Sequence, residues 1–346
     1  MDKTKEYNNF IIFSNKFRFM NLLLTLSVAA MHLSYWVSGE PDIVIRIMRN
    51  SAAGSMGWFF FASAFWYFGN YSYENALPKF RKRLRTLLIP YVVWNLLRFL
   101  YLYGIDIIKA GNLDSHWKLF LEAFLFVNRE PYSYAPIISA LWYIIRLLSY
   151  FLVAPLIYFL LKDKYIGAVV ILATFFVTRN GSYYSFEGFL CIFMIGAYIS
   201  INFREKFIEI YTASKLGRNR KILGTIGCVS AYALLVLIWI GISGKVMWRG
   251  VAYLFQFLVS AVSIFLFDVV DVKQEVGAYS FMIYCSHVFW APILNIVIGC
   301  VNNKFPITSG MWAMLLLVGV VLISIAICKI TKKYFPTIYG ILTGGR

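Results

Sequence analysis

Residues 19–38 read FMNLLLTLSVAAMHLSYWVS, an apolar run that contains one histidine, His32, and no Asp, Glu, Lys or Arg. About 20 predominantly apolar residues are enough for one helix to cross the hydrocarbon of a bilayer. A charged group at that depth costs at least ~2.5 kcal/mol, so it usually faces a polar cavity or a partner. The run therefore predicts a membrane-spanning first helix and a candidate functional site within it.

The composition extends this prediction to the whole chain. Of the 346 residues, 60% are hydrophobic and only 14% are charged, and the mean hydropathy is +0.70. One soluble core cannot bury so much apolar surface, so we expect an all-α, polytopic integral membrane protein forming a single membrane-embedded domain over residues 1–346. Apolar runs predict about ten membrane-spanning helices. They cover residues 19–38, 54–70, 86–105, 136–161, 165–178, 184–202, 222–243, 249–268, 278–298 and 308–331.

The net charge of +17 would suit nucleic-acid binding if the basic residues formed one soluble face. They lie instead in short loops between apolar runs, as the positive-inside rule requires, so no nucleic-acid partner is expected. A cytoplasmic N-terminus places most of the 33 Lys and Arg residues on the inner side. We therefore expect a multi-pass protein of the inner or plasma membrane with both termini in the cytoplasm.

The sequence predicts neither a metal site nor a soluble-enzyme site. The five cysteines fall within or at the edges of apolar runs, without CxxC pairs or metal-ligand spacing, and are typical of small buried hydrophobes. The sequence contains no GxSxG, P-loop or HExxH motif. Any chemistry must therefore come from polar residues inside the membrane.

Two histidines and two arginines lie deep inside the predicted helices: His32, His287, Arg98 and Arg146. Each histidine has two interpretations, a hydrogen bond to a neighbouring helix or a general base whose neutral form exists near the working pH. Each arginine needs an acceptor, which for Arg98 is either Glu187 or an anionic ligand such as a phosphate. Structural pairing and ligand binding both stay open at this point.

A basic run, Lys79 to Arg85, precedes the third predicted helix, in which Pro90 lies one turn from the start. The run is either an orientation signal or a docking place for a cytosolic phosphate. The outside loop 106–135 contains apolar and aromatic residues that suit an amphipathic helix. In the second helix, Ala62, Ser63 and Ala64 form a strip of small residues for packing.

Six segments in this order resemble the acyltransferase-3 family over essentially the whole chain. They are the first-helix histidine, FFFASAF (59–65), a basic run ending in LLIPYVVW (87–94), LWYIIRLLSYFLVAPL (141–156), FLCIFMIGAYIS (189–200) and SFMIYCSH (280–287). The resemblance implies a membrane O-acyltransferase that moves an acyl group, commonly acetyl, from cytosolic acyl-CoA to hydroxyls of a surface polysaccharide or glycolipid. It implies no metal.

The resemblance also assigns roles to individual residues. His32 matches the first-helix histidine, and Ser63 lies in the FFxxSGF segment, where Ala64 replaces the glycine. Lys82 and Arg85 match the RxxR element, Trp142 matches the tryptophan of the fourth helix, and His287 matches the late histidine. The implied roles are catalysis for His32, acyl-CoA binding for Lys82 and Arg85, and lining of the cavity for Ser63, Trp142 and His287.

One position departs from the family pattern. The family has a basic residue eleven positions before the histidine, about three helical turns away on the same face, and here that position is Asn21. The nearest cation is Arg18, one turn further back and about 40 degrees round the helix. Three interpretations stay open: Arg18 replaces the missing cation in acyl-CoA binding, the donor site is altered, or the protein is inactive.

The hypothesis is a mechanism in which His32 takes the proton of an acceptor hydroxyl or relays the acyl group, while Arg146 or a neighbouring hydroxyl stabilises the developing oxyanion. Arg98 would also line the cavity. The alternative is a polysaccharide polymerase or lipid-linked sugar transporter whose intramembrane arginines hold a pyrophosphate. A third possibility is an inactive relative that acts as a scaffold.

Overall fold

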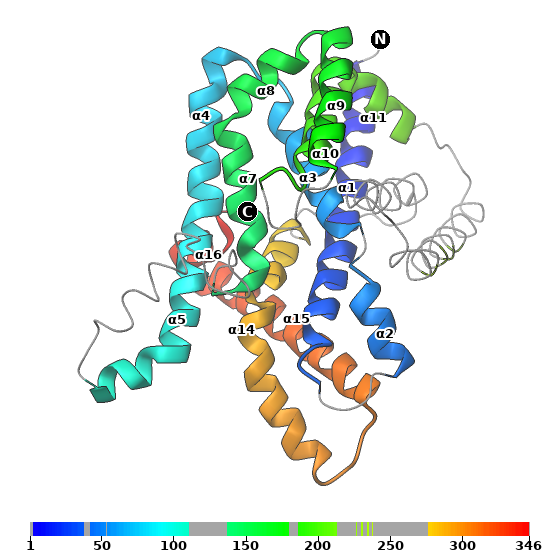
Figure 1. Cartoon of the computed structure of the whole chain (residues 1–346). Coiled ribbons are helices and arrows are strands. Elements are labelled where there is room, and N and C mark those ends of the chain that lie inside the picture. Colours follow the sequence, from blue (N-terminus) through cyan, green and yellow to red (C-terminus); the bar gives the residue numbers. More distant parts are fainter. Residues whose placement is uncertain are drawn as a thin grey trace. The chain divides into compact units, whose positions relative to one another are not determined.

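The computed structural model describes residues 3–37, 42–52, 54–110, 137–179, 186–212 and 276–345, and the isolated positions 226, 230, 234 and 237 (Figure 1). Every regular element in these ranges is a helix, which confirms the predicted all-α class. The predicted helices 222–243 and 249–268, and almost all of the loop 106–135, lie outside the described residues.

Three helical stretches of the described residues are long and apolar enough to cross a membrane. The first, Tyr73–Gly104, joins α4 (Tyr73–Arg83), the π-helical turn η1 (Leu84–Leu88) and the start of α5 (Ile89–Ala110). The others are α14 (Val276–Asn302) and α15 (Ser309–Tyr334). A broken helix pair raises the number to four, so the predicted count of about ten is not confirmed.

That broken pair corrects the prediction of one continuous helix over residues 136–161. The structure has a short 3-10 turn η2 (Ser139–Leu141), α7 (Trp142–Leu152) and α8 (Ala154–Leu161). Pro155 lies in the first turn of α8. Because proline has no N–H and its ring clashes with the carbonyl four residues earlier, it begins a new helix rather than continuing the old one.

Other boundaries follow the apolar runs more closely. They are those of α3 (Ser55–Phe68), α9 (Lys164–Thr178) and the C-terminal end of α10 (Leu190–Asn202), whereas α2 (Ile43–Asn50), α11 (Arg204–Thr212) and α16 (Pro336–Thr343) lie outside every predicted run. The first helix, α1 (Lys3–Leu33), begins well before the predicted residue 19. Its early part contains Phe13 and Phe17, whose rings pack against Phe65 of α3, so tertiary contacts extend the helix beyond its apolar run.

The chain groups into two compact units, each made of three separate segments. Unit 1 comprises Met1–Val28, Asn50–Lys79 and Leu152–Gly277. Unit 2 comprises Ala29–Arg49, Phe80–Phe151 and Ala278–Arg346. Helix α1 passes from one unit to the other between Val28 and Ala29, and the single-domain prediction stays a prediction.

In unit 1 the helices α3 and α10 approach each other closely. A Cβ added to Gly196 would lie 2.4 Å from the carbonyl oxygen of Phe61 and 3.1 Å from Cβ of Ala64. The Ser200 hydroxyl, one turn further along α10, donates to the Phe65 carbonyl at 2.6 Å. Small residues that let backbones touch are typical of helix pairs in membranes, where packing rather than hydrophobicity drives association.

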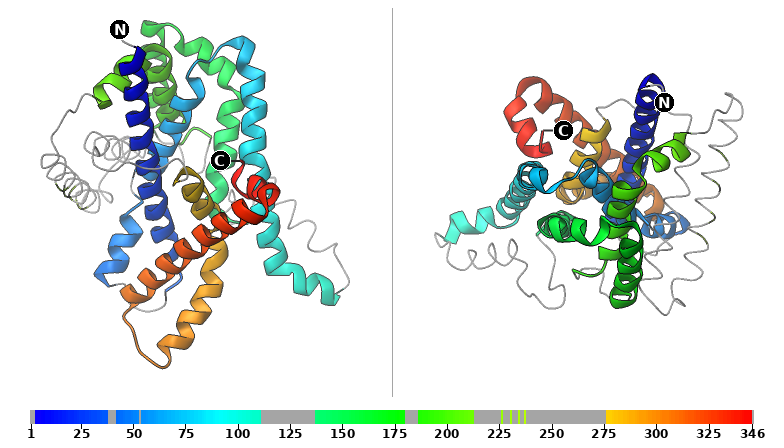
Figure 2. Two further views of the ribbon diagram at one scale, coloured as in Figure 1. Left: turned by 180° about the vertical axis from the view of Figure 1, so that it is seen from behind. Right: turned by 90° about the horizontal axis from the view of Figure 1, so that it is seen from above.

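In unit 2 the long helices α14 and α15 cross and are joined by the short turn between them (Figure 2). Their contact includes a hydrogen bond between the Ser286 and Ser324 hydroxyls at 2.8 Å and one from the Trp312 indole to Asn295 at 2.8 Å. The Asp42 carboxylate accepts from the Ile45 and Gly310 amides, at 3.0 and 2.7 Å, and so joins the start of α2 to α15.

Proline also explains the π-helical turn η1 in the basic segment. Pro90 offers no N–H to the carbonyl of Thr86, and its ring displaces that carbonyl, which is a recognised cause of irregular turns in helices. Gly344, at φ +69, packs onto this Thr86 carbonyl, because a Cβ on Gly344 would clash with the carbonyl oxygen. The C-terminal end of unit 2 is thereby packed on the turn that carries Arg85.

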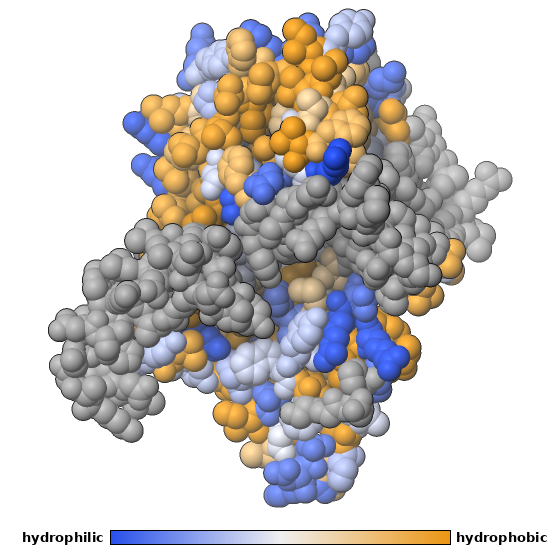
Figure 3. All heavy atoms as spheres, viewed as in Figure 1, coloured by the Kyte–Doolittle hydropathy of each residue, from blue (hydrophilic) through white to orange (hydrophobic). Residues whose placement is uncertain are grey.

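Large apolar side chains cover the outer faces of α8 and α9, as Figure 3 shows in orange. On α9 alone, Tyr165, Val169 and Val177 are 78%, 66% and 81% exposed. A soluble protein rarely leaves so much contiguous apolar surface in water. These faces suit contact with lipid chains.

We expect Gly196→Ala to destabilise the protein by about 1–3 kcal/mol, because its Cβ meets backbone atoms that cannot move aside. Gly104→Ala is the matched control, since a Cβ at Gly104 of α5 meets nothing within 4 Å. That change should be neutral or stabilise by up to about 1 kcal/mol through helix propensity. Denaturant unfolding in detergent measures both, and equal effects would contradict the close-packing interpretation.

Candidate functional site

Two of the sequence-predicted residues come together in unit 2: His32, in the last turn of α1, and His287, in the middle of α14. Their imidazole rings are 5.3 Å apart between centroids and inclined by 40°. His287 is completely buried, whereas His32 is only partly so. No described residue forms a hydrogen bond with the His32 ring.

Backbone contacts fix the tautomer of His287. Its Nδ1 lies 3.1 Å from the Ile283 carbonyl oxygen and 2.8 Å from that of Tyr284. Because both oxygens can only accept, Nδ1 carries the proton and Nε2 presents a lone pair. This Nε2 is buried and has no hydrogen-bond partner among the described residues. The site therefore contains one oriented nitrogen able to accept a proton.

Neighbouring residues of α14 hold this nitrogen in place. The Tyr284 hydroxyl donates to the Ala140 carbonyl of η2, and the Tyr284 ring packs edge-on against Tyr143 of α7 at 6.1 Å. Ser286, immediately before the histidine, donates to the Met282 carbonyl at 2.7 Å. A histidine oriented by such surroundings is suited to proton transfer with little reorganisation.

Trp142 and Arg146 lie one turn apart on α7, on the helix that contacts Tyr284. Trp142 is buried and begins the helix, next to Tyr143. Arg146 is half-buried. The structure thus places both predicted residues on the element beside the histidine-bearing segment of α14.

Arg98 lies on the buried face of α5, with only 7% of its side chain exposed. The Tyr101 ring is 5.3 Å from the guanidinium carbon. On the same face, Trp94 donates to the Leu342 carbonyl at 3.2 Å, and its ring is 6.1 Å from that of Phe289 on α14. Arg98 therefore belongs to the packed interior of unit 2.

The basic run contains residues with different surroundings. Lys79 of unit 1 donates to the Tyr67 and Gly69 carbonyls, at 3.1 and 2.6 Å, at the end of α3. Arg83 lies over the Phe151 ring at 5.6 Å. Lys82, at the end of α4, and Arg85, in the π-helical turn, are exposed. π-helical turns are rare and occur often at functional sites.

Asn21, at the position where the family has a cation, accepts a hydrogen bond from the Trp58 indole at 3.0 Å. Trp58 is completely buried, so its N–H depends on this acceptor. A lysine or arginine has no acceptor atom and cannot replace the asparagine in this bond. The asparagine and the tryptophan therefore form a matched structural pair in unit 1.

Arg18 donates to the Asn15 side chain at 2.8 Å. Asn15 lies one turn towards the N-terminus, which is the direction that helical side chains usually lean. The guanidinium thus points away from the turn that holds Asn21. Ser63 of α3, also in unit 1, is half-buried next to the strip that packs on α10.

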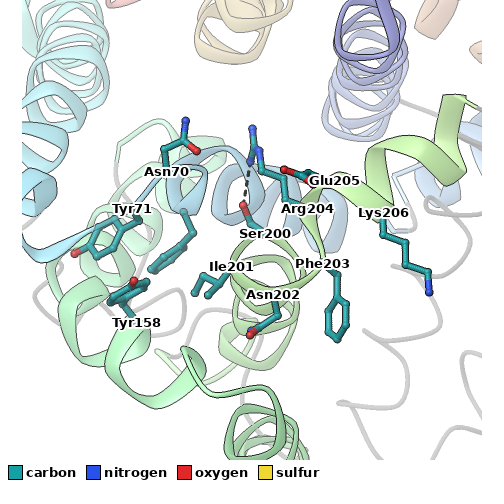
Figure 4. A pocket seen from close by; sticks show the side chains of 11 residues that line it. Asn70, Tyr71, Tyr158, Ser200, Ile201, Asn202, Phe203, Arg204, Glu205 and Lys206 are labelled. Atoms are coloured by element: carbon teal, nitrogen blue, oxygen red, sulfur yellow. Dashed lines mark hydrogen bonds between the residues drawn. The ribbon is translucent and has the colours of Figure 1, made fainter. Parts of the chain in front are cut away.

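A cavity of about 530 Å³ lies in unit 1, between the ends of α3 and α8 and the junction of α10 with α11 (Figure 4). Arg204 donates to the Phe65 carbonyl at 3.2 Å and to the Ser200 hydroxyl at 3.0 Å, and burial lowers its pKa. Burial also raises the pKa of Tyr71 to about 12. Asn202 donates to the Leu161 carbonyl at 2.9 Å. These polar groups mainly tie helix ends together.

The model of the acyltransferase domain family Acyl_transf_3 matches residues 18–329, nearly the whole chain. The chain belongs to the acyltransferase-3 family. As a member, this acyltransferase-3 protein is a membrane acyltransferase in general terms. No curated protein and no solved structure matches it. Of its predicted site residues, His32, Lys82, Arg85, Arg98, Trp142, Arg146 and His287 lie in unit 2, and Arg18 and Ser63 lie in unit 1.

The sequence did not predict the role of Tyr284 beside His287, the π-helical turn, or the structural Asn21–Trp58 bond of unit 1. A signal existed for two of them, because Tyr284 is one turn from His287 and Pro90 lies just after the basic run. The partner of Asn21 comes from another helix, and no local pattern specifies it.

We expect Asn21→Leu to destabilise the protein by about 1–3 kcal/mol, because it leaves the buried Trp58 N–H without an acceptor. In a Trp58→Phe background, where that N–H is absent, the same change should cost clearly less. Unfolding of the four proteins in the cycle measures the difference. Additive costs would show that the bond contributes nothing.

Proposed function

We propose that the protein transfers an acyl group, most simply acetyl, from cytosolic acyl-CoA to a hydroxyl of a surface polysaccharide or glycolipid. The observation that carries this proposal is the His32–His287 pair, with its oriented, unprotonated Nε2. Family membership supports the reaction class. The proposed location is the cell membrane, with both termini in the cytoplasm.

Acyl transfer to a hydroxyl needs a proton acceptor. The acceptor oxygen forms a bond to the thioester carbonyl carbon, the carbon–sulfur bond breaks, and coenzyme A leaves as the thiolate. His32 takes the hydroxyl proton, and the proton can then return to the thiolate. Two imidazolium ions this close in an apolar interior repel strongly, so at most one ring of the pair carries a positive charge.

The other residues have supporting roles in this proposal. Arg146 supplies positive charge for the oxyanion that forms on the thioester carbonyl. Trp142 lines the acyl-transfer site in unit 2. His287 packs beside His32 and keeps the site free of a second charge.

Lys82 and Arg85 are the proposed contacts for the phosphates of acyl-CoA. They are exposed, and they lie three residues apart where the helix changes from α to π. Guanidinium and ammonium groups form strong charge-assisted bonds to phosphate. Because Asn21 is engaged with Trp58 and Arg18 with Asn15, these two cations carry the donor-binding proposal.

We expect His32→Ala to abolish acylation while leaving glycan chains at their normal length. The measurement is the mass of the host's surface glycans in a deletion strain complemented with wild type or variant. The third histidine, His116, supplies the matched control, since His116→Ala should restore acylation fully. Wild-type acylation by the His32→Ala protein would contradict the catalytic assignment. Shortened glycans in the deletion strain would favour a polymerase or transporter.

We expect the double change Lys82→Ala/Arg85→Ala to weaken acetyl-CoA binding by at least about tenfold, because two charge-assisted contacts are lost. Arg81→Ala removes an exposed cation of the same run and should bind nearly as well as wild type. Calorimetry on purified protein gives both affinities. Equal weakening by the two variants would show a general charge effect instead of a site.

A further inference from the structure

Arg98 is a buried cation whose donors are not satisfied. Its Nε and Nη1 atoms are inaccessible and have no hydrogen-bond partner among the described residues. The ring of Tyr101 lies beside the guanidinium, but an aromatic face replaces only part of the lost hydration. A buried charge without an acceptor is strongly disfavoured, so an anion is needed at this position.

The described side chains of unit 2 offer one candidate for that anion. Among its described side chains, Asp42 is the one carboxylate, and backbone amides of Ile45 and Gly310 already occupy it. The helix α14, which packs against the same face of α5, contains no acidic residue. The acceptor for Arg98 is therefore not found among the described groups of its own unit.

The position of Arg98 on α5 indicates where an anion could come from. The buried face of the helix runs through Tyr91, Trp94 and Arg98 to Phe99, and then Leu100 is 50% exposed. Arg98 is seven residues, about 10 Å of helix, before the end of the apolar run 86–105 that the sequence predicts as membrane-spanning. An arginine at this depth is within reach of the headgroup region of a bilayer.

We propose that Arg98 binds the phosphate group of a membrane lipid. Phosphate offers oxygens in the arrangement that a guanidinium fork matches, and charge-assisted bonds of this kind are the strong ones. A lipid brings the phosphate to the correct depth by lateral diffusion. That this lipid is the polyprenyl carrier of the sugar acceptor rests on the proposed function.

Arg98→Met tests the site without reference to catalysis. In uncharged detergent the variant should melt at or above the wild-type temperature, because it removes an unpaired buried charge. Polyprenyl phosphate should raise the melting temperature of wild type in a concentration-dependent way, and polyprenol of the same length should not. Arg98→Met should bind polyprenyl phosphate at least about tenfold more weakly, while Arg98→Lys, which keeps the charge but loses the fork, should be intermediate.

Lys304→Met is the matched control, because it removes an exposed cation from the same unit and should leave the lipid response unchanged. A phosphatidylglycerol arm identifies the source of the phosphate. A response to polyprenyl phosphate alone supports the acceptor carrier. An equal response to phosphatidylglycerol supports the phosphate site but contradicts the assignment of the lipid as the polyprenyl carrier.

Two results would overturn the site itself. The first is equal stabilisation of wild type and Arg98→Met by polyprenyl phosphate. The second is a loss of lipid-free stability in Arg98→Met that Glu187→Gln reproduces, which would identify Glu187 as an internal partner. Acyl transfer is assayed separately. A protein without acyltransferase activity that still shows Arg98-dependent lipid binding would contradict the proposed function but not the phosphate site.

Discussion

The constraint on which this structure depends is that polar groups inside a bilayer must find partners within the protein. Helices satisfy the backbone, and side-chain hydroxyls bond back to their own helix, as Ser286 does with Met282 and Thr331 with Ile327. His287 follows the same rule when its Nδ1–H donates to helix carbonyls. Several buried atoms of the described residues break the rule, and Nε2 of His287 and the donors of Arg98 are the ones on which the proposals above rest.

The same constraint distinguishes two arginines, Arg204 and Arg98. Arg204 is surrounded by a carbonyl, a hydroxyl and aromatic rings, so it serves as a clamp between α3 and α10. Its guanidinium also fills the place where any side chain at Gly69 would lie. Arg98 is more deeply enclosed and has fewer partners. Equal formal charge thus serves structure at Arg204, whereas the partner of Arg98 is the subject of the lipid-phosphate proposal.

The sequence predicted α3, α9, α14 and α15 to within a few residues, because each coincides with an apolar run bounded by polar residues. It did not predict the early start of α1 or the break at Val153, where aromatic packing and Pro155 override the apolar pattern. For the candidate site, single residues such as His32 and His287 were identified individually. Their proximity depends on packing between distant segments, which no local periodicity records.

Helix α1 carries both Asn21 and His32 on one continuous rod that passes from unit 1 into unit 2. Eleven residues of α-helix separate them by about 16 Å, whatever the arrangement of the two units. Helix α1 thus fixes the distance between these two residues. The Asn21–Trp58 bond of unit 1 and the histidine of the candidate site are therefore held at a fixed spacing along a single helix.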